Sequence, residues 1–220
     1  MIISLLRSTI ISTGSHQSPH NVGDNKTGGT PLRAARPDRS VTAIPTDVTD
    51  PKELDALVGH TLDEHGRIDV LVNNAGQGFY GPVAGTDLDL YRRILEVNLV
   101  APLAAMQAVL PSMREHGRGV IINVSSGASL GAYPTTGAYA STKAALNQLM
   151  AVARAELAPE GITISLIHPY LTESEFNHAL LGGHPIVAAP EAPEHTAEYV
   201  ATTLIDLIRT GREATVLLPA

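Results

Sequence analysis

Short, almost wholly apolar runs alternate along this chain with stretches that repeat apolar residues at helical spacing. Three of these runs, at residues 68–72, 120–124 and 162–167, have the length of a β-strand. Such runs are typical of strands buried on both faces, and a parallel sheet covered by helices on both sides buries strands in this way. The sequence therefore predicts a doubly wound α/β fold with a parallel sheet, in a single domain.

Local signals place the other elements of this fold. Asp50 is suited to cap a helix that has Pro51 as its first residue, and Gly66 is suited to end it. Gly117 and Gly119 end a later helical stretch in the same way. We expect helices over residues 51–65, 87–101, 102–116, 138–159 and 194–209, and further strands over residues 41–45 and 214–218.

The first 40 residues differ from the rest in composition. They hold five basic and two acidic residues, for a net charge of +3, whereas the whole chain carries −7. Seventeen of them are Gly, Pro, Ser or Thr, which favour turns and loops. We therefore expect an irregular segment over residues 1–40 and an ordered domain over residues 41–220, with the first strand–helix unit incomplete or irregular.

Composition also excludes several classes of function. The chain has no cysteine, so disulfide scaffolds, thiolate metal sites and cysteine nucleophiles are excluded. Its negative net charge argues against nucleic acid and anionic membranes as partners. No unbroken apolar run reaches the about 20 residues of a membrane span, and the nine histidines show no ligand spacing that predicts a metal site. We expect a cytoplasmic protein.

Polar residues follow three of the predicted strands. Asn73, Asn74, Ala75 and Gly76 end one strand, Ser125 and Ser126 end the next, and His168 precedes Thr172 and Ser174 after a third. Ligands of doubly wound sheets bind outside the carboxyl ends of the strands. The sequence therefore predicts a ligand site at this edge.

A tyrosine and a lysine extend the apolar seam of the helix that follows Ser126. Leu146, Met150 and Ala153 continue the seam that begins with Tyr139 and Lys143, one turn apart. One interpretation is that Lys143 extends to a loop carbonyl for structural reasons. The other is chemical: a tyrosine pKa near ~10 is too high for proton transfer at neutral pH, and a neighbouring ammonium lowers it.

These residues, together with others, resemble the motifs of the short-chain dehydrogenases/reductases. The motifs, in chain order, are Asp47-Val48, Asn73-Asn74-Ala75-Gly76, the helix asparagine Asn98, the serine Ser126, and Tyr139-Ala140-Ser141-Thr142-Lys143. The resemblance covers roughly residues 41–220. It implies a Rossmann-like fold and an NAD or NADP cofactor.

The resemblance also implies a reaction and a role for each residue. An alcohol and a carbonyl interconvert by hydride transfer, with Tyr139 as proton donor or acceptor and Lys143 lowering its pKa. Ser126 orients the substrate oxygen, and Asn98 holds a water that links Lys143 to solvent. The implied cofactor-binding residues are Asp47, Val48, Asn74, Ala75, Gly76, Tyr139, Lys143, Thr172 and Ser174. A small-molecule alcohol or carbonyl substrate and a homodimer or homotetramer follow from the same resemblance.

Two departures from the family pattern leave alternatives open. The usual Thr-Gly-x-x-x-Gly-x-Gly loop is not found, because Thr13-Gly14 is followed by no further glycine until Gly23. In addition, Tyr170 stands where the family usually has glycine. The N-terminal segment is an atypical loop that still binds the cofactor, a truncated or frame-shifted start, or part of a module that only binds. The alternative function is a cofactor-deficient, weakly active or inactive family member that acts through association with a partner.

The predicted substrate pocket is partly apolar. Loops over residues 77–86, 127–137 and 170–192 are expected to line it, and they contribute Phe79, Tyr80, Tyr133, Leu180 and Leu181. This lining favours a small or medium-sized apolar alcohol or ketone over a sugar phosphate.

Overall fold

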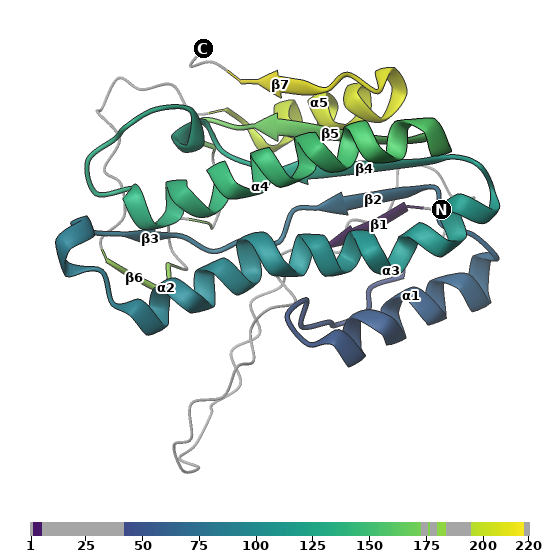
Figure 1. Cartoon of the computed structure of the whole chain (residues 1–220), viewed down its shortest axis with the longest axis horizontal. Helices are drawn as coiled ribbons and strands as arrows, with labels where there is room; N and C mark the ends of the chain where they lie inside the picture. Colours follow the sequence, from purple (N-terminus) through teal and green to yellow (C-terminus); the bar gives the residue numbers. More distant parts are fainter. Residues whose placement is uncertain (1, 6–41, 173–175, 177–179, 184–194, 218–220) are drawn as a thin grey trace, which may run out of the picture.

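A parallel sheet of five strands forms the centre of the protein (Figure 1). The structure is a computed structural model and describes residues 2–5, 42–172, 176, 180–183 and 195–217. The strands lie in the order β1 (Ile2–Leu5), β2 (Val70–Asn73), β4 (Gly119–Val124), β5 (Ile162–His168) and β7 (Ala214–Val216). The predicted doubly wound α/β fold is confirmed.

Strand register brings the polar strand ends to one edge of the sheet. Asn73 pairs with Asn123 across β2 and β4, and Val124 pairs with Ile167 across β4 and β5. All four strand pairings of this sheet are parallel. The carboxyl ends of the strands therefore meet at a common edge, as the sequence predicted.

Helices cover both faces of the sheet. On one face α1 (Pro51–His65), α3 (Ala101–Glu115) and α4 (Gly137–Leu157) pack against Leu71, Ile121 and Ile164 (Figure 1). On the other face α5 (Ala197–Thr210) packs through Leu207 against a second set of strand side chains that includes Ile122. Both faces of the strands are buried, which explains why their sequences are almost continuously apolar.

In helix α1, neighbouring residues determine where the helix begins and where it ends. The Asp50 side chain accepts a hydrogen bond from the Lys52 amide at 2.8 Å, and Pro51 opens the helix. At the other end Gly66 adopts a left-handed backbone with φ of 72° and donates to the carbonyl of Leu62. Both ends fall where the sequence predicted them.

The two helices predicted over residues 87–116 form one continuous rod. Helix α2 (Leu88–Leu95) passes into a π-helical turn (Glu96–Val100), and α3 follows directly. In this turn the amide of Ala101 donates to the carbonyl of Glu96, five residues back. Pro102 lies in the first turn of α3 and does not break the rod, because a proline is tolerated there.

The rod is also the one candidate membrane span among the residues that the structure describes. By length and composition alone, Leu88–Glu115 is long and apolar enough to cross a membrane. Half of its most apolar window is buried inside the protein. A core helix passes the same test, and α3 is such a helix.

Four local predictions differ from the structure. Described residues 42–46 form no strand, and Pro45 within them has no amide hydrogen to donate to a ladder. Strand β1 lies inside the segment that was expected to be irregular. The long loop after β5 contributes β6 (Gly182–Gly183), which pairs with β3 (Phe79–Tyr80) in a separate two-stranded ladder. Strand β7 ends at Val216, earlier than predicted.

Candidate active site

Tyr139 and Ser126 meet at the carboxyl edge of the sheet. Tyr139 lies in the first turn of α4 and is only 6% exposed, and Ser126 lies just beyond the end of β4. The Ser126 side chain lies close enough to Tyr139 to lower the pKa of the phenol. The Ser126 hydroxyl also accepts the amide of Ala128 at 3.1 Å, because Ser126 caps the short 3₁₀ turn Gly127–Leu130. The single Ser126 proton is therefore available to the Tyr139 oxygen.

Lys143 lies one helical turn after Tyr139 and is also buried. Its Nζ donates at 2.9 Å to the carbonyl of Val124, the last residue of β4. The same Nζ lies beside Gly76, where an added Cβ atom would be 3.4 Å from it. Lys143 therefore faces the loop that follows β2 as well as the end of β4.

Asn98 joins these two regions from the π-helical turn. It is fully buried, and its amide pairs with the backbone of Gln77, accepting the amide hydrogen at 2.9 Å and donating to the carbonyl at 2.8 Å. Its Nδ2 also donates to the Thr142 hydroxyl at 3.0 Å. The Asn98 side chain thus fixes the loop after β2 against α4, next to Lys143.

Burial dominates the electrostatics of the tyrosine and the lysine. Burial raises the pKa of Tyr139 to about 12, and the nearby Ser126 side chain opposes that rise only in part. Burial also lowers the pKa of Lys143 to about 8. The expected lowering of the tyrosine pKa is therefore not seen in this closed arrangement, because desolvation outweighs the stabilisation of the phenolate.

Two aromatic rings account for the burial of Tyr139. The Tyr80 ring packs edge-on against it with 5.8 Å between ring centroids, and the Phe176 ring lies at 5.6 Å. Burial raises the pKa of Tyr80 as well. Tyr80 was a predicted pocket residue, whereas Phe176 was not, because nothing in the local sequence indicates that residue 176 returns to α4.

The remaining predicted pocket residues divide into two groups. Phe79 is buried. Leu180 and Leu181 lie against Gly78: a Cβ atom added at Gly78 would be 2.7 Å from Leu180 Cδ2. The Leu181 amide donates to the Gly78 carbonyl. Tyr133, in contrast, is 47% exposed and packs beside Gly131.

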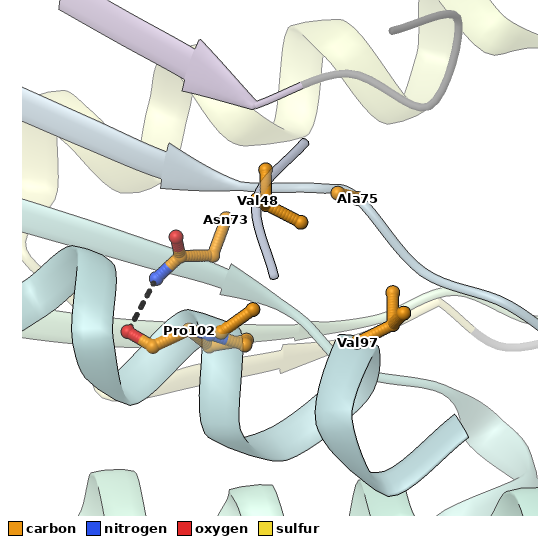
Figure 2. Close-up of a pocket in the computed structure, with 6 residues that line it drawn as sticks. Val48, Asn73, Ala75, Val97 and Pro102 are labelled. Carbon is orange, nitrogen blue, oxygen red and sulfur yellow. Dashed lines mark hydrogen bonds between the residues drawn. The ribbon is translucent and has the colours of Figure 1, made fainter. Parts of the chain in front are cut away.

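Two of the predicted cofactor-binding residues, Val48 and Ala75, line a small hollow (Figure 2). Val48, Ala75 and Val97 line it together with Asn73, and its volume of about 10 Å³ is room for one water molecule. Asn73 Nδ2 donates to Asn123 and to the carbonyl of Pro102, while its buried Oδ1 has no hydrogen-bond partner. The hollow thus contains an unused acceptor.

Asp47 and Asn74 lie beside this hollow on the chain, and both are half-buried. One carboxylate oxygen of Asp47 accepts both the amide and the hydroxyl of Thr49, at 2.9 and 2.7 Å. No hydrogen bond of the Asn74 side chain is found within the described part of the chain. The structure therefore places Asp47 in a tight local turn.

After β5, the chain passes over the Ser126 turn. The Gly127 amide donates to the carbonyl of Pro169 at 2.8 Å, and the Tyr170 ring would lie 3.3 Å from a Cβ atom added at Gly127. Thr172 forms an isolated parallel bridge with His195. Tyr170 therefore packs against the turn that follows Ser126. Ser174 lies outside the described residues.

This fold and this site define a class of protein, the α/β oxidoreductases that bind a nucleotide cofactor at the carboxyl edge of a parallel sheet. A family model described as short chain dehydrogenase matches residues 25–182. The chain belongs to the short-chain dehydrogenase family. Members of this family use NAD or NADP.

Two curated relatives illustrate the similarity. The chain is 38% identical over 123 residues to trans-4-hydroxycyclohexanecarboxylate dehydrogenase of Sinomonas cyclohexanicum, covering 56% of this chain and 47% of that protein. It is 31% identical over 183 residues to 2-(R)-hydroxypropyl-CoM dehydrogenase of Xanthobacter autotrophicus, covering 80% of this chain and 72% of that protein. The chain thus spans about half the length of the first relative (47%) and more of the second.

A solved structure agrees with this assignment. A metagenomic short-chain oxidoreductase in complex with NADP superposes with a TM-score of 0.64 and 29% identity, over 80% of this chain and 72% of that chain. The predicted family membership and fold are therefore confirmed.

Proposed function

We propose that this chain is an NAD(P)-dependent oxidoreductase that interconverts an alcohol and a carbonyl compound, with Tyr139 as proton donor or acceptor. The observation that carries the proposal is the convergence of Tyr139, Lys143 and Asn98, all buried, at the sheet edge beside Ser126, whose side chain lies close enough to Tyr139 to lower its pKa. Two neighbouring hydroxyls with a lysine one helical turn away are suited to hold and move a proton on a substrate oxygen.

The residues present fit a nicotinamide dinucleotide at two points. The hollow beside Val48 and Ala75 is apolar, and the unused Asn73 Oδ1 turns away from Pro102 there (Figure 2). Gly76 keeps the space in front of Lys143 and Asn98 free of a side chain. We assign the adenine end to the sheet edge beside Val48 and Ala75, next to this hollow, and the ribose beside the nicotinamide to Lys143. The described residues assign no loop for the pyrophosphate.

In the proposed mechanism, the chain binds and polarises a substrate oxygen. Ser126 donates its hydroxyl hydrogen to that oxygen, and Tyr139 gives a proton to it in reduction or takes one in oxidation. Lys143 holds positive charge close to Tyr139 and favours the phenolate once water or ligand relieves the burial of both groups. When bound, the nicotinamide supplies or accepts the hydride. Asn98 keeps the loop at Gln77 against α4 while this happens.

The lining around Tyr139 supports an apolar substrate. Tyr80 and Phe176 cover the Tyr139 ring, and Leu180 packs against Gly78 beside Phe176. A substrate that reaches the Tyr139 hydroxyl replaces part of this apolar cover. We propose that the substrate is an alicyclic or aromatic alcohol or ketone, because such a molecule restores the apolar contacts that it displaces. A sugar phosphate would not restore them.

Assembly and location complete the proposal. We propose a homodimer or homotetramer, supported by the exposed Val100 and Val152 on the outer sides of the rod and of α4, and a cytoplasmic location.

A second candidate function rests on the missing glycine-rich loop, which the sequence lacks between Gly14 and Gly23. In that case the chain is a family member that does not bind the cofactor and acts through association with a partner. The two candidates differ first of all in their affinity for the dinucleotide.

The test is calorimetric titration of the purified chain with NADH and with NADPH, followed by turnover assays. Micromolar binding of either dinucleotide, and oxidation of an alicyclic alcohol that Tyr139→Phe does not catalyse, are expected. Absence of binding at millimolar dinucleotide would reject the enzyme and favour the second candidate. Binding without turnover across alicyclic, aromatic and sugar alcohols would reject the proposed reaction alone.

A further inference from the structure

Helix α4 carries three polar side chains in one stripe, spaced four residues apart. Each of them faces a different residue at the end of β4: Tyr139 lies near enough to Ser126 for that side chain to lower its pKa, Lys143 donates to the Val124 carbonyl, and Asn147 accepts from the Ser125 hydroxyl. The first two contacts belong to the proposed reaction. The third has no role in that reaction, although it is made by the same face of the same helix.

Asn147 is the centre of a directed chain of hydrogen bonds. The buried Ser125 hydroxyl donates to Asn147 Oδ1 at 2.5 Å, and Asn147 Nδ2 donates to the Ser129 hydroxyl at 2.9 Å. The Ser129 hydroxyl donates in turn to the carbonyl of Ser126 at 2.6 Å. Because Ser129 accepts from Asn147, its one proton is directed to Ser126. Bonds that point in one direction strengthen one another.

The chain of hydrogen bonds ends on a residue whose hydroxyl direction matters. The Ser126 carbonyl accepts the Ser129 amide at 3.1 Å as well as the Ser129 hydroxyl. The Ser126 hydroxyl is held from the other side by the amide of Ala128 at 3.1 Å. The orientation of Ser126 therefore depends on the turn that Ser129 closes.

An amide is suited to the position of Asn147. It accepts through oxygen and donates through nitrogen at the same time, so it can connect two hydroxyls in a fixed direction. A carboxylate only accepts, and an apolar side chain does neither. Without Asn147 the Ser125 hydroxyl, which belongs to a residue that is 4% exposed, keeps only the longer contact of 3.5 Å with the Ser129 hydroxyl.

We propose that Asn147 is a positioning residue, which through Ser129 fixes the Ser126 carbonyl and thereby directs the Ser126 hydroxyl toward Tyr139. The inference rests on the proposed function, because the direction of this hydroxyl matters when a substrate oxygen binds there. It adds a residue outside the predicted site that acts on the reaction through its neighbours.

The test compares Asn147→Leu with Gln148→Leu, which places the same apolar side chain at the adjacent position of α4. We expect Asn147→Leu to lower kcat about tenfold to a hundredfold, because small displacements of groups at a reacting centre reduce the rate by such factors. Dinucleotide affinity is expected to stay unchanged. In a Ser126→Ala background the same substitution is expected to cost less than about twofold, because coupled residues are not additive. Gln148→Leu is expected to change neither value.

Amide hydrogen exchange gives a readout that needs no activity. The Ala128 amide, held by the Ser126 hydroxyl, is expected to exchange about tenfold faster in Asn147→Leu and in Ser129→Ala, because local opening exposes it. The Gly127 amide, held by Pro169, serves as internal control. Ser129→Ala breaks the same chain of hydrogen bonds without altering α4, so it decides the matter if Asn147→Leu does not fold.

Two results would overturn the inference. One is an equal loss of kcat by Asn147→Leu in the wild-type and Ser126→Ala backgrounds, which would make Asn147 a packing residue. The other is unchanged exchange at Ala128 in both variants. A wild-type chain that turns over no alcohol or carbonyl would reject the proposed function, while the exchange result would still decide whether Asn147 orders the Ser126 turn.

Discussion

Two corners of the same sheet edge are held in different ways. Where β4 ends, side chains from distant parts of the chain converge: Lys143 bonds to Val124, and Asn98 pairs with the backbone of Gln77. Beside β2, around residues 46–50, the bonds are local: Asp47 bonds to Thr49, and the Asp47 amide donates to Glu53 Oε2 at 2.6 Å. The first corner is fixed by the fold, and the second mainly by its own turn.

The comparison indicates where a ligand adds order. Segments with few long-range contacts open at low free-energy cost, and ligands that bind only the folded state stabilise them. The corner with Tyr139 and Ser126 is held by side chains from distant parts of the chain. The corner with Asp47 and Val48, where we place adenine, has an unused acceptor at Asn73 Oδ1. Four predictions test this difference.

The largest effect is expected at Tyr139. Tyr139→Phe removes the hydroxyl that exchanges a proton and keeps the ring that packs against Tyr80 and Phe176. We expect turnover to fall about a thousandfold, within the range of general acid–base catalysis, with circular dichroism and melting temperature almost unchanged. Turnover above a tenth of the wild-type value would contradict the proton-transfer role. Tyr133→Phe, at an exposed tyrosine, is the matched control.

Lys143→Ala is expected to affect both corners. It removes the charge beside Tyr139 and the Nζ that faces Gly76, so we expect kcat to fall about tenfold to a hundredfold and dinucleotide affinity to fall with it. Steady-state kinetics and calorimetry measure the two quantities separately. The exposed Lys52→Ala is the control. If neither quantity changed, Lys143 would serve only to hold the Val124 carbonyl.

The buried lysine and tyrosine predict how stability depends on pH. Burial lowers the pKa of Lys143 from 10.5 to about 8, so between these values the unfolded chain holds a proton that the folded chain lacks. The free energy of unfolding contributed by Lys143 therefore rises with pH across that window. Burial raises the pKa of Tyr139 from 10.0 to about 12, so its contribution is present below pH 10.0 and is lost as the pH approaches 12.

Urea unfolding at a series of pH values measures this profile. We expect Lys143→Met to flatten the rise above pH 8 and Tyr139→Phe to flatten the fall above pH 10. A rise that persists unchanged in Lys143→Met would mean that another group causes it.

The smallest effect compares two glycines. A Cβ atom at Gly76 would lie 3.3 Å from Asn98 Oδ1 and 3.4 Å from Lys143 Nζ, whereas one at Gly59 in α1 meets nothing within 4 Å. We expect Gly76→Ala to destabilise the fold by about 1 kcal/mol and to weaken dinucleotide binding. Gly59→Ala is expected to stabilise α1 by about 0.5–1 kcal/mol. Equal effects on thermal unfolding would show that the space at Gly76 has no special use.

Short-range signals explain which features the sequence predicted well. Asp50, Pro51 and Gly66 define α1 because caps depend on neighbouring residues, and the apolar runs define three central strands. The spacing of Tyr139 and Lys143 placed both on one buried face, and the motif order placed Ser126 and Asn98 near them. These features are local or repeat with a known period.

Long-range features were missed for the opposite reason. The ladder between β3 and β6 joins residues about 100 positions apart, and Phe176 reaches Tyr139 from the same loop. That contact adds to the burial that raises the pKa of Tyr139. The neighbouring lysine alone would lower this pKa. Asn147 was missed because its partners Ser125 and Ser129 lie on another element.

The π-helical turn at Glu96–Val100 has a consequence for insertions and deletions. Each residue added to a helix rotates the rest of that helix by about 100°. The turn brings Asn98 to the site while α2 buries Ile94 and α3 buries Ala101 and Ala105. A single residue gained or lost there would rotate the whole apolar face of α3 away from the sheet. The number of residues in this turn therefore sets both the position of Asn98 in the site and the orientation of the apolar face of α3. A change in that number would disturb the site and the core together.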